Sequence, residues 1–537
     1  MKPLFKKLIS GARRASAGWP SLARRASIVV IFLAAGSTQA AEVLSNGFGG
    51  GSWSDQATWR GKKVPGPTDD VIIQKNDIVF ADRKEDDKIS CNKLQIDPRG
   101  GLTFKSGSGK IIFAVADAIE NYGVIRLDGT KHATDHFELW LVGDKADKRK
   151  VKLMKGSALL LFGKSAETRN VSIAAPKFGD QKDDILGLVE AGTVSTLDVQ
   201  RAQVNNVKLY ATNIDNTGAK ANERLNVIDC QFTGQGRVYC HTCDTAIIAR
   251  NSFHWAGEGQ LTEAAISLAA CPLGEIKDNT IRGNFVSGIY LYANTDVVVT
   301  GNTIERCALG INNHVTINTM IKNCRIKGCP DGVSFHTTTA VLENVYIEEA
   351  TTWMNNYQST VQLANVELKH RLPGQGKIIQ DGGSFTILNC NILPKQLKMI
   401  QPQAANPKNP PLTVIAMEYL VVGVKDAGPD MLVEVRTAKP PLAADAADPN
   451  VRNAQGPLVK GLTPLPKTLY PIIVKSWAMD PKGTLIAAPE YTIKIMGAPA
   501  KEGAPRPLLK TMPFRPGDTH FRALPNDRTP TLEVPLK

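Results

Sequence analysis

A six-residue pattern with apolar ends recurs through the middle of the chain. Its copies are VIDCQF, IARNSF, IKDNTI, VTGNTI, IKNCRI, LENVYI, LANVEL and ILNCNI. Their fourth positions are Cys230, Asn251, Asn279, Asn302, Cys324, Val345, Val366 and Cys390, at steps of 21 to 28 residues. A second column, Gly288-Ile289, Gly310-Ile311 and Gly332-Val333, recurs every 22 residues. A fixed period of this length indicates a solenoid.

The segments between the repeats alternate apolar and polar residues over short runs, which predicts two or three strands per repeat. Each repeat is then one coil of a parallel β-helix, with apolar residues inward and about 4.8 Å between coils. Asn at an inward corner would form a ladder with its copies, and Cys there would pack as a small hydrophobe. Leucine-rich and helical solenoids are the alternative, but the strand-like composition argues against them. Crossover chirality predicts a right-handed helix.

Residues 47–130 carry a series of glycine, tryptophan and aspartate motifs. In order these are Gly47-Phe48-Gly49-Gly50-Gly51, Trp53-Ser54-Asp55, Thr58-Trp59, Gly61, Pro65, Asp70-Val71-Ile72-Ile73 and Gly101-Leu102-Thr103-Phe104. The series resembles the G8 domain of extracellular hyaluronan-binding and hyaluronan-depolymerising proteins. The resemblance implies a β cap over residues 41–130 that precedes β-helix repeats, here 131–400. The family's acidic catalytic motif has no match here. We expect the two Trp residues to seal the first coil rather than bind glycan.

The 22-residue period stops near Pro402. The Pro-rich stretch 401–411 predicts a linker. Alternating strands follow in 412–497, and their pattern resembles a small β-sandwich of the transthyretin or carboxypeptidase-regulatory kind. Residues 498–537, rich in Pro, Lys and Arg, predict an extended tail. The expected fold is therefore all-β, a right-handed parallel β-helix with a G8-like cap and a C-terminal β-sandwich.

The first forty residues predict a signal peptide. They hold seven Lys and Arg and no acid, followed by the apolar run 26–35 and a small-x-small site ending at Ala40. Without them the formal charge of +13 falls to about +6, so no nucleic-acid partner is expected. The apolar run is too short to span a bilayer. Arg24-Arg25 leaves twin-arginine export open beside the general route. We expect a secreted, periplasmic or cell-surface monomer without a membrane span after signal removal.

Nine cysteines leave at least one thiol free. Cys307 and Cys329 are 22 residues apart and should form a buried thiol stack between coils, rather than a disulfide. The pair in Cys240-His241-Thr242-Cys243 has no second C-x-x-C, so the sequence predicts neither a zinc site nor another metal or cofactor.

Alternation along the repeats predicts a stripe of rings and polar groups on one outward face. If Ile289 points inward, Tyr290 and Tyr292 point outward, and the 22-residue period carries this to the neighbouring coils. The candidate catalytic residues on the stripe are His314, His336 and Tyr292. The candidate substrate-binding residues are His241, Tyr290, Asn312, Ser334, Asn355 and Tyr357. We expect His132, His136 and His370 to lie outside it as solvated residues.

Such a stripe suits a linear polysaccharide, because ring faces stack on sugars and amides bind hydroxyls. A His or Tyr base could support β-elimination at C5 of a uronic acid. Hydrolysis would need two carboxylates about 5–9 Å apart. Four acids in flanking turns are candidates without an evident pair: Glu258, Glu263, Asp296 and Asp331. We expect a lyase or hydrolase of an acidic extracellular or cell-surface polysaccharide, or a binder of it. The alternative is a non-catalytic adhesion or structural β-helix that acts as a spacer.

Overall fold

The computed structural model describes residues 40–515 and 531–535 with several gaps. The gaps are 83–87, 177–185, 193, 213–224, 244, 258, 370–375, 400–412, 426–430, 438–459, 464–471, 480–484, 488–489. The predicted signal peptide up to residue 39 and the predicted linker lie outside the described residues, as do Glu258 and His370. No helix in the described part is long and apolar enough to cross a membrane.

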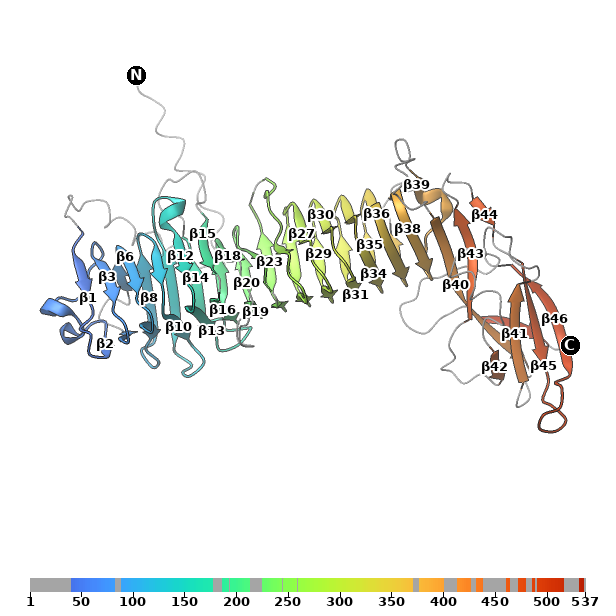
Figure 1. Cartoon of the computed structure of the whole chain (residues 1–537), viewed down its shortest axis with the longest axis horizontal. Helices are drawn as coiled ribbons and strands as arrows, with labels where there is room; N and C mark the ends of the chain where they lie inside the picture. The colour runs from blue at the N-terminus through green and yellow to red at the C-terminus, as the bar shows by residue number, and fades with distance from the viewer. Residues whose placement is uncertain are drawn as a thin grey trace, which may run out of the picture.

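Three parallel sheets wind around one core and form an elongated solenoid (Figure 1). Sheet I contains β1 (Glu42–Leu44), β3 (Asp70–Ile73), β6 (Lys93–Ile96), β9 (Ile119–Asn121), β12 (Lys150–Leu153), β15 (Gly187–Ala191), β18 (Val207–Thr212), β21 (Arg237–His241), β24 (Ile266–Ala269), β27 (Ser287–Tyr292), β30 (Leu309–His314), β33 (Asp331–His336) and β39 (Leu397–Met399). Sheet II contains β2 (Gly50–Ser52), β4 (Ile78–Ala81), β7 (Gly101–Phe104), β10 (Val124–Asp128), β13 (Ala158–Phe162), β16 (Thr196–Gln200), β19 (Leu225–Ile228), β22 (Ala246–Ala249), β25 (Glu275–Lys277), β28 (Val298–Thr300), β31 (Thr319–Lys322), β34 (Thr339–Glu343) and β40 (Thr413–Lys425). The long strands β36 (Thr352–Ala364) and β38 (Lys377–Leu388) run through sheets I and II.

Sheet III closes the third side. It contains β5 (Lys88–Cys91), β8 (Lys110–Val115), β11 (His136–Leu141), β14 (Val171–Ala174), β17 (Gln203–Asn205), β20 (Gln231–Thr233), β23 (Ser252–Trp255), β26 (Thr280–Gly283), β29 (Thr303–Glu305), β32 (Arg325–Lys327), β35 (Tyr346–Glu348) and β37 (Glu367–Lys369). One strand of each sheet in chain order makes a coil. The predicted parallel β-helix is confirmed. Helical structure among the described residues is limited to four 3-10 turns, η2 (Gln56–Thr58), η3 (Arg60–Lys62), η4 (Ala146–Lys148) and η5 (Pro394–Gln396).

The interior is built from apolar residues in parallel register. Ile289, Ile311 and Val333 face one another on consecutive coils, and each is at most 1% exposed. A fully buried side chain of this size contributes roughly 1.5–3 kcal/mol of transfer free energy. Because every second residue of a short strand points inward, this stack fixes which residues point outward.

A buried asparagine ladder lies at the corner between sheets II and III. Asn251 Nδ2 donates to Asn279 Oδ1 at 3.0 Å, and Asn279 Nδ2 donates to Asn302 Oδ1 at 3.0 Å. The residues just before the first two, Arg250 and Asp278, have φ of 55° and 53°. This left-handed residue makes the sharp corner, and the side-chain amide of the Asn that follows it bonds backbone groups of the preceding coil, as when Asn279 accepts from the Asn251 N–H and donates to the Ile248 carbonyl. The ladder expected from the sequence is therefore present.

Strands β1 to β10, in the segment predicted as a cap, pair within the same three sheets as the later coils. Trp53 and Trp59 are only 3% and 2% exposed, and their rings meet edge to face at 4.9 Å. Trp59 Nε1 also donates to the Trp53 carbonyl at 2.8 Å. Both rings therefore serve packing near the first coils and present no open face to a ligand.

Antiparallel strands follow the solenoid. β40 continues sheet II in parallel with β38 and pairs antiparallel with β43 (Ile472–Met479), which in turn pairs with β44 (Leu485–Ala487). β40 also pairs in parallel with β47 (Thr531–Pro535). A separate four-stranded antiparallel sheet contains β42 (Lys460–Thr463), β41 (Met431–Thr437), β45 (Tyr491–Met496) and β46 (Leu508–Phe514). The sandwich remains a prediction, and β46 lies in the segment predicted as an extended tail.

Candidate functional site

Two outward columns on sheet I contain all nine candidate residues of the predicted stripe. The ring column is His241, Ala269, Tyr292, His314, His336 and Tyr357, in direct register on consecutive coils. The polar column beside it is Tyr239, Ser267, Tyr290, Asn312, Ser334 and Asn355. Alternation along each strand puts both columns on the outer face, two residues apart. Ala269 occupies the coil between His241 and Tyr292.

The rings of the ring column stack on one another. Centroid distances are 5.4 Å for Tyr292 and His314, 4.3 Å for His314 and His336, and 4.4 Å for His336 and Tyr357. The first and third pairs are near parallel, at 13° and 21°. The faces of the inner rings are thus covered by their neighbours, and ring edges are the part that can face solvent. The sequence interpretation of ring faces stacking on sugars does not fit these inner rings.

His314 has an unusual environment in this stack. Its Nδ1 is buried and makes no hydrogen bond, whereas Nδ1 of His336 lies 3.3 Å from Thr337 Oγ1. Burial, followed by the positive charge that His336 can carry, lowers the pKa of His314. The imidazole of His314 is therefore neutral at pH 7 and retains a basic nitrogen. Burial also raises the pKa of Tyr290, so its phenol is a hydrogen-bond donor rather than a phenolate base at neutral pH.

A cationic cluster, not anticipated from the sequence, continues the polar column toward the N-terminus. Lys208 Nζ lies 2.7 Å from Glu263 Oε2. It also lies 5.2 Å from the ring centroid of Tyr210 and 5.0 Å from that of Tyr239. Arg237 Nε lies 3.0 Å from the same Glu263 oxygen. The alternating sequence VKLYAT of β18 places Lys208 and Tyr210 on the outer face of sheet I and could have revealed both residues. The 22-residue count missed them because residues 213–224 interrupt the period.

The candidate carboxylates for hydrolysis do not come together as a pair in any contact of the described residues. Burial alone would raise the pKa of Glu263, but its hydrogen bond to Lys208 and the charge of Arg237 lower it. Glu263 is thus held as an anion in an ion pair. Asp296 accepts a hydrogen bond from Asn318 Nδ2 at 3.1 Å, and Asp331 is exposed at the start of β33.

A second polar cluster lies on the outer face of sheet III and includes His136, which lies outside the ring column as expected and is part exposed, but which also has a hydrogen-bond partner. His136 Nε2 donates to Glu138 Oε1 at 2.9 Å, and Trp140 Nε1 donates to Glu138 Oε2 at 2.7 Å. Lys110 Nζ lies 3.5 Å from Glu138, which is 5% exposed. Burial opposes ionisation, yet these partners lower the pKa of Glu138 to about 2. The alternating sequence HFELWL places His136, Glu138 and Trp140 on one face and could have revealed the cluster.

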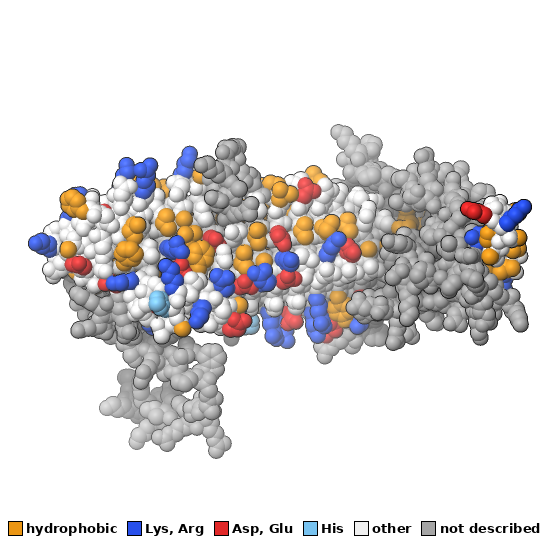
Figure 2. Space-filling view, turned by 90° about the horizontal axis from the view of Figure 1, so that it is seen from below, with side chains coloured by type: hydrophobic (Ala, Val, Ile, Leu, Met, Phe, Trp, Pro, Cys, Tyr) orange, Lys and Arg blue, Asp and Glu red, His pale blue; other side chains and the backbone are white. Residues whose placement is uncertain are grey.

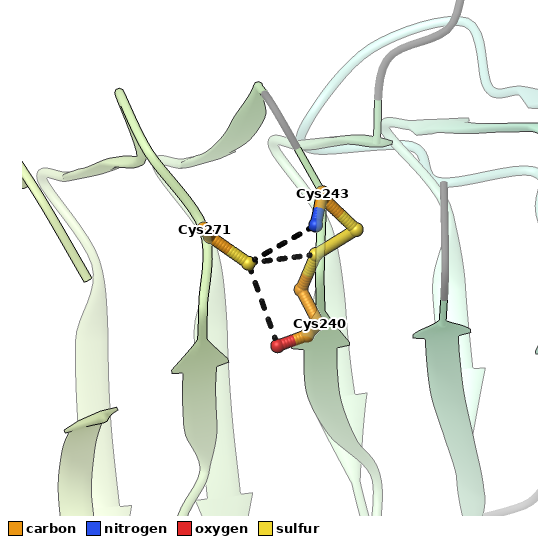
Figure 3. A group of neighbouring side chains, drawn as sticks. All are labelled: Cys240, Cys243 and Cys271. Carbon is orange, nitrogen blue, oxygen red and sulfur yellow. Dashed lines mark hydrogen bonds between the residues drawn. A yellow bond between two sulfur atoms is a disulfide. The ribbon is translucent and has the colours of Figure 1, made fainter. Parts of the chain in front are cut away.

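Three cysteines meet at the corner that follows β21 (Figure 3). Cys240 and Cys243 form a disulfide, and the Cys271 sulfur of the next coil lies 3.5 Å from the Cys240 sulfur. These sulfurs are the one group of three or more metal-ligating side chains found within the described part of the chain. With two of them joined, only Cys271 offers a thiol. Cys307 and Cys329 are buried free thiols with a hydrogen bond between them that raises the pKa of Cys307, which confirms the predicted thiol stack.

Charges on the surface are mixed in sign. On the face seen in Figure 2, Lys and Arg side chains lie among Asp and Glu side chains. Sheet III also carries pairs between coils, such as Arg282 with Glu305 at 3.7 Å and Arg325 with Glu348 at 3.4 Å. Interspersed charges of this kind give no continuous basic surface for a polyanion on the face shown.

The comparisons with known proteins concern the solenoid. The family model described as "Right handed beta helix region" matches residues 192–351. Solved structures similar to this chain include the periplasmic alginate epimerase AlgG, at 9% identity over 62% of this chain and 74% of that chain, with a TM-score of 0.21. The A-module of the mannuronan C-5 epimerase AlgE6 from Azotobacter vinelandii is similar at 11% identity over 63% and 92%, with a TM-score of 0.22. No curated protein matches this chain. The matched family model and the three-sheet coils agree that the chain contains a right-handed parallel β-helix.

Proposed function

We propose that this protein is an exported β-helix protein that binds an extracellular or cell-surface polysaccharide along the two outward columns of sheet I. The observation that carries the proposal is the register of these columns, because each coil from β21 to β36 except that of β24 offers a ring edge beside a hydroxyl, phenol or amide. Coils are about 4.8 Å apart, comparable to the length of one sugar unit. A linear glycan lying along the solenoid axis would therefore meet a similar set of hydrogen-bonding groups at successive units.

Catalysis is the finer part of the proposal. A neutral His314 with His336 and Tyr292 beside it supplies the base and the hydroxyl that β-elimination of an acidic glycan requires. Hydrolysis has less support, because Glu263 is engaged by Lys208 and Arg237. The proposal keeps the sequence-based division: signal peptide 1–40, G8-like cap 41–130, β-helix 131–400, linker 401–411, sandwich 412–497 and tail 498–537.

One observation favours a second function, a non-catalytic adhesion or spacer protein. The rings of the ring column pack against one another from coil to coil, as expected of side chains that stabilise a long solenoid. Under this alternative, replacing the polar column would change no binding.

The test is a screen of the mature chain, residues 41–537, against acidic and neutral polysaccharides. Retardation in glycan-containing gels reports binding, ultraviolet absorbance of unsaturated uronate reports elimination, and new reducing ends report cleavage. We expect Asn355→Ala, at an exposed position of the polar column, to weaken retardation, and His314→Ala to abolish any elimination product. Gln362→Ala is the matched control, since Gln362 is exposed on the same strand β36 but in sheet II. No retardation by any glycan would favour the spacer function.

A further inference from the structure

The buried sulfurs at the corner after β21 carry an inference independent of the glycan proposal. We propose that Cys240, Cys243 and Cys271 form a thiol–disulfide exchange site, in which one disulfide moves between a pairing within a coil and a pairing between two coils.

The geometry supplies both reactants. The Cys271 sulfur lies 3.5 Å from the Cys240 sulfur, close to van der Waals contact, and the three sulfurs lie within 4.8 Å of one another. The Cys243 N–H donates to the Cys271 sulfur at 3.5 Å. The Cys271 sulfur also donates to the carbonyls of Ala269 at 3.2 Å and Cys240 at 3.6 Å, so its resting form is the thiol, and these contacts together hold it beside the disulfide (Figure 3).

The exchange balances without an external reagent. The Cys271 thiol loses its proton, and the thiolate attacks the Cys240 sulfur. The bond from Cys240 to Cys243 breaks, the bond from Cys240 to Cys271 forms, and Cys243 leaves as the thiolate and takes up the proton. One disulfide and one thiol are present before and after, so no electron is gained or lost.

The two pairings constrain the fold differently. Cys240 and Cys243 are 3 residues apart, whereas Cys240 and Cys271 are 31 apart and belong to consecutive coils. Only the second pairing closes a loop that spans a coil, and a longer loop removes more entropy from the unfolded chain. His241, the first residue of the ring column, lies between Cys240 and Cys243. The pairing within the coil constrains the backbone around His241, and the pairing between coils releases that constraint.

All three cysteines are at most 1% exposed, so external thiols have little access to them. The same burial disfavours the thiolate, and we expect exchange over minutes to hours rather than seconds. Cys230, Cys324 and Cys390, buried ladder cysteines with no disulfide beside them, serve as internal controls.

The first test uses the full mature chain purified without reductant. After incubation at neutral pH, the protein is quenched in acid, unfolded with a maleimide at low pH and digested, and mass spectrometry locates the label. We expect two populations, one with Cys271 labelled and one with Cys243 labelled and Cys240 joined to Cys271. Label on Cys271 in every molecule would overturn the proposal, and so would label on Cys240 or on all three.

A pair of variants tests the two pairings one at a time. Cys271→Ser should leave a single species with Cys240 joined to Cys243, and label on Cys243 in this variant would expose exchange with other thiols. Cys243→Ser refolded from denaturant in the presence of oxidised glutathione, so that the oxidant reaches the thiols before they are buried, should form the bond between Cys240 and Cys271, releasing two molecules of reduced glutathione. A folded Cys243→Ser protein that keeps both thiols under this oxidant would refute the proposed contact.

Discussion

Glu138 offers the sharpest stability prediction, because a carboxylate that is nearly buried on an outer sheet face must be stabilised by its partners. Its pKa falls from the ordinary 4.5 to about 2. A shift of about 2.5 units corresponds to about 3 kcal/mol at 1.36 kcal/mol per unit. Lys110 and His136 are 45% and 40% exposed, so solvent screening reduces this value, and we expect about 1–3 kcal/mol.

The perturbation is Glu138→Gln, which keeps the shape and removes the charge. Gln has one acceptor oxygen, so the donors on His136 and Trp140 cannot both be satisfied as before. Since the folded pKa is depressed, the stabilisation is fully present above about pH 4.5 and is lost as the pH falls toward 2. The difference between wild type and variant should therefore be largest near pH 7 and shrink below pH 4.

The assay is hydrogen exchange of peptides that cover β8 and β11, because long repeat arrays do not unfold in two states. A loss of about 1–3 kcal/mol corresponds to about 5- to 150-fold weaker protection at pH 7. Glu305→Gln is the matched control, because it breaks the more exposed pair with Arg282. Its effect is measured in peptides that cover β26 and β29, where protection should change far less. Equal losses in the two variants, or a Glu138→Gln effect that persists unchanged at pH 2.5, would refute the reasoning.

Three further predictions concern the core and the ring column. Asn279→Ala removes the central rung of the buried ladder and takes away the side-chain partner of the Asn251 N–H and of the Ile248 carbonyl, so we expect about 2–4 kcal/mol of local destabilisation, measured as lost protection in β25 and β26. Ile311→Ala creates a cavity at a fully buried position and should cost about 2–5 kcal/mol, seen as a lower melting temperature. His314 should titrate below its ordinary 6.5 in an NMR titration of the ring protons, and because its folded pKa is depressed, its environment destabilises the fold as the pH falls below about 6.5.

The repeat could be predicted because its physics is local and periodic. Inward positions such as Ile289 and Ile311 must be apolar on every coil, and the strand alternation then determines the outward positions. This is why the nine stripe residues share a face. The contact between Cys271 and Cys243 was missed because the two residues are 28 positions apart. A count of 22 residues per coil therefore does not align them. The ring stacking was missed because side-chain rotation is not encoded in a count of residues.

Stacked rings do not by themselves decide between a binding surface and a stiffening ladder. A prestacked ring loses little side-chain entropy when a ligand arrives, so self-stacking is compatible with binding. Tyr292 separates the two, since it is 41% exposed, lies at the N-terminal end of the stack and offers a hydroxyl besides its ring. Tyr292→Phe keeps the contact with His314 and removes only the hydroxyl, whereas Tyr292→Ala removes both. If the column binds glycan, Tyr292→Phe should weaken gel retardation about 2- to 10-fold with unchanged hydrogen exchange in β27 and β30. If the column only stiffens the solenoid, Tyr292→Phe will match wild type in every assay and Tyr292→Ala alone will lose protection, a result that would contradict a binding role for this hydroxyl.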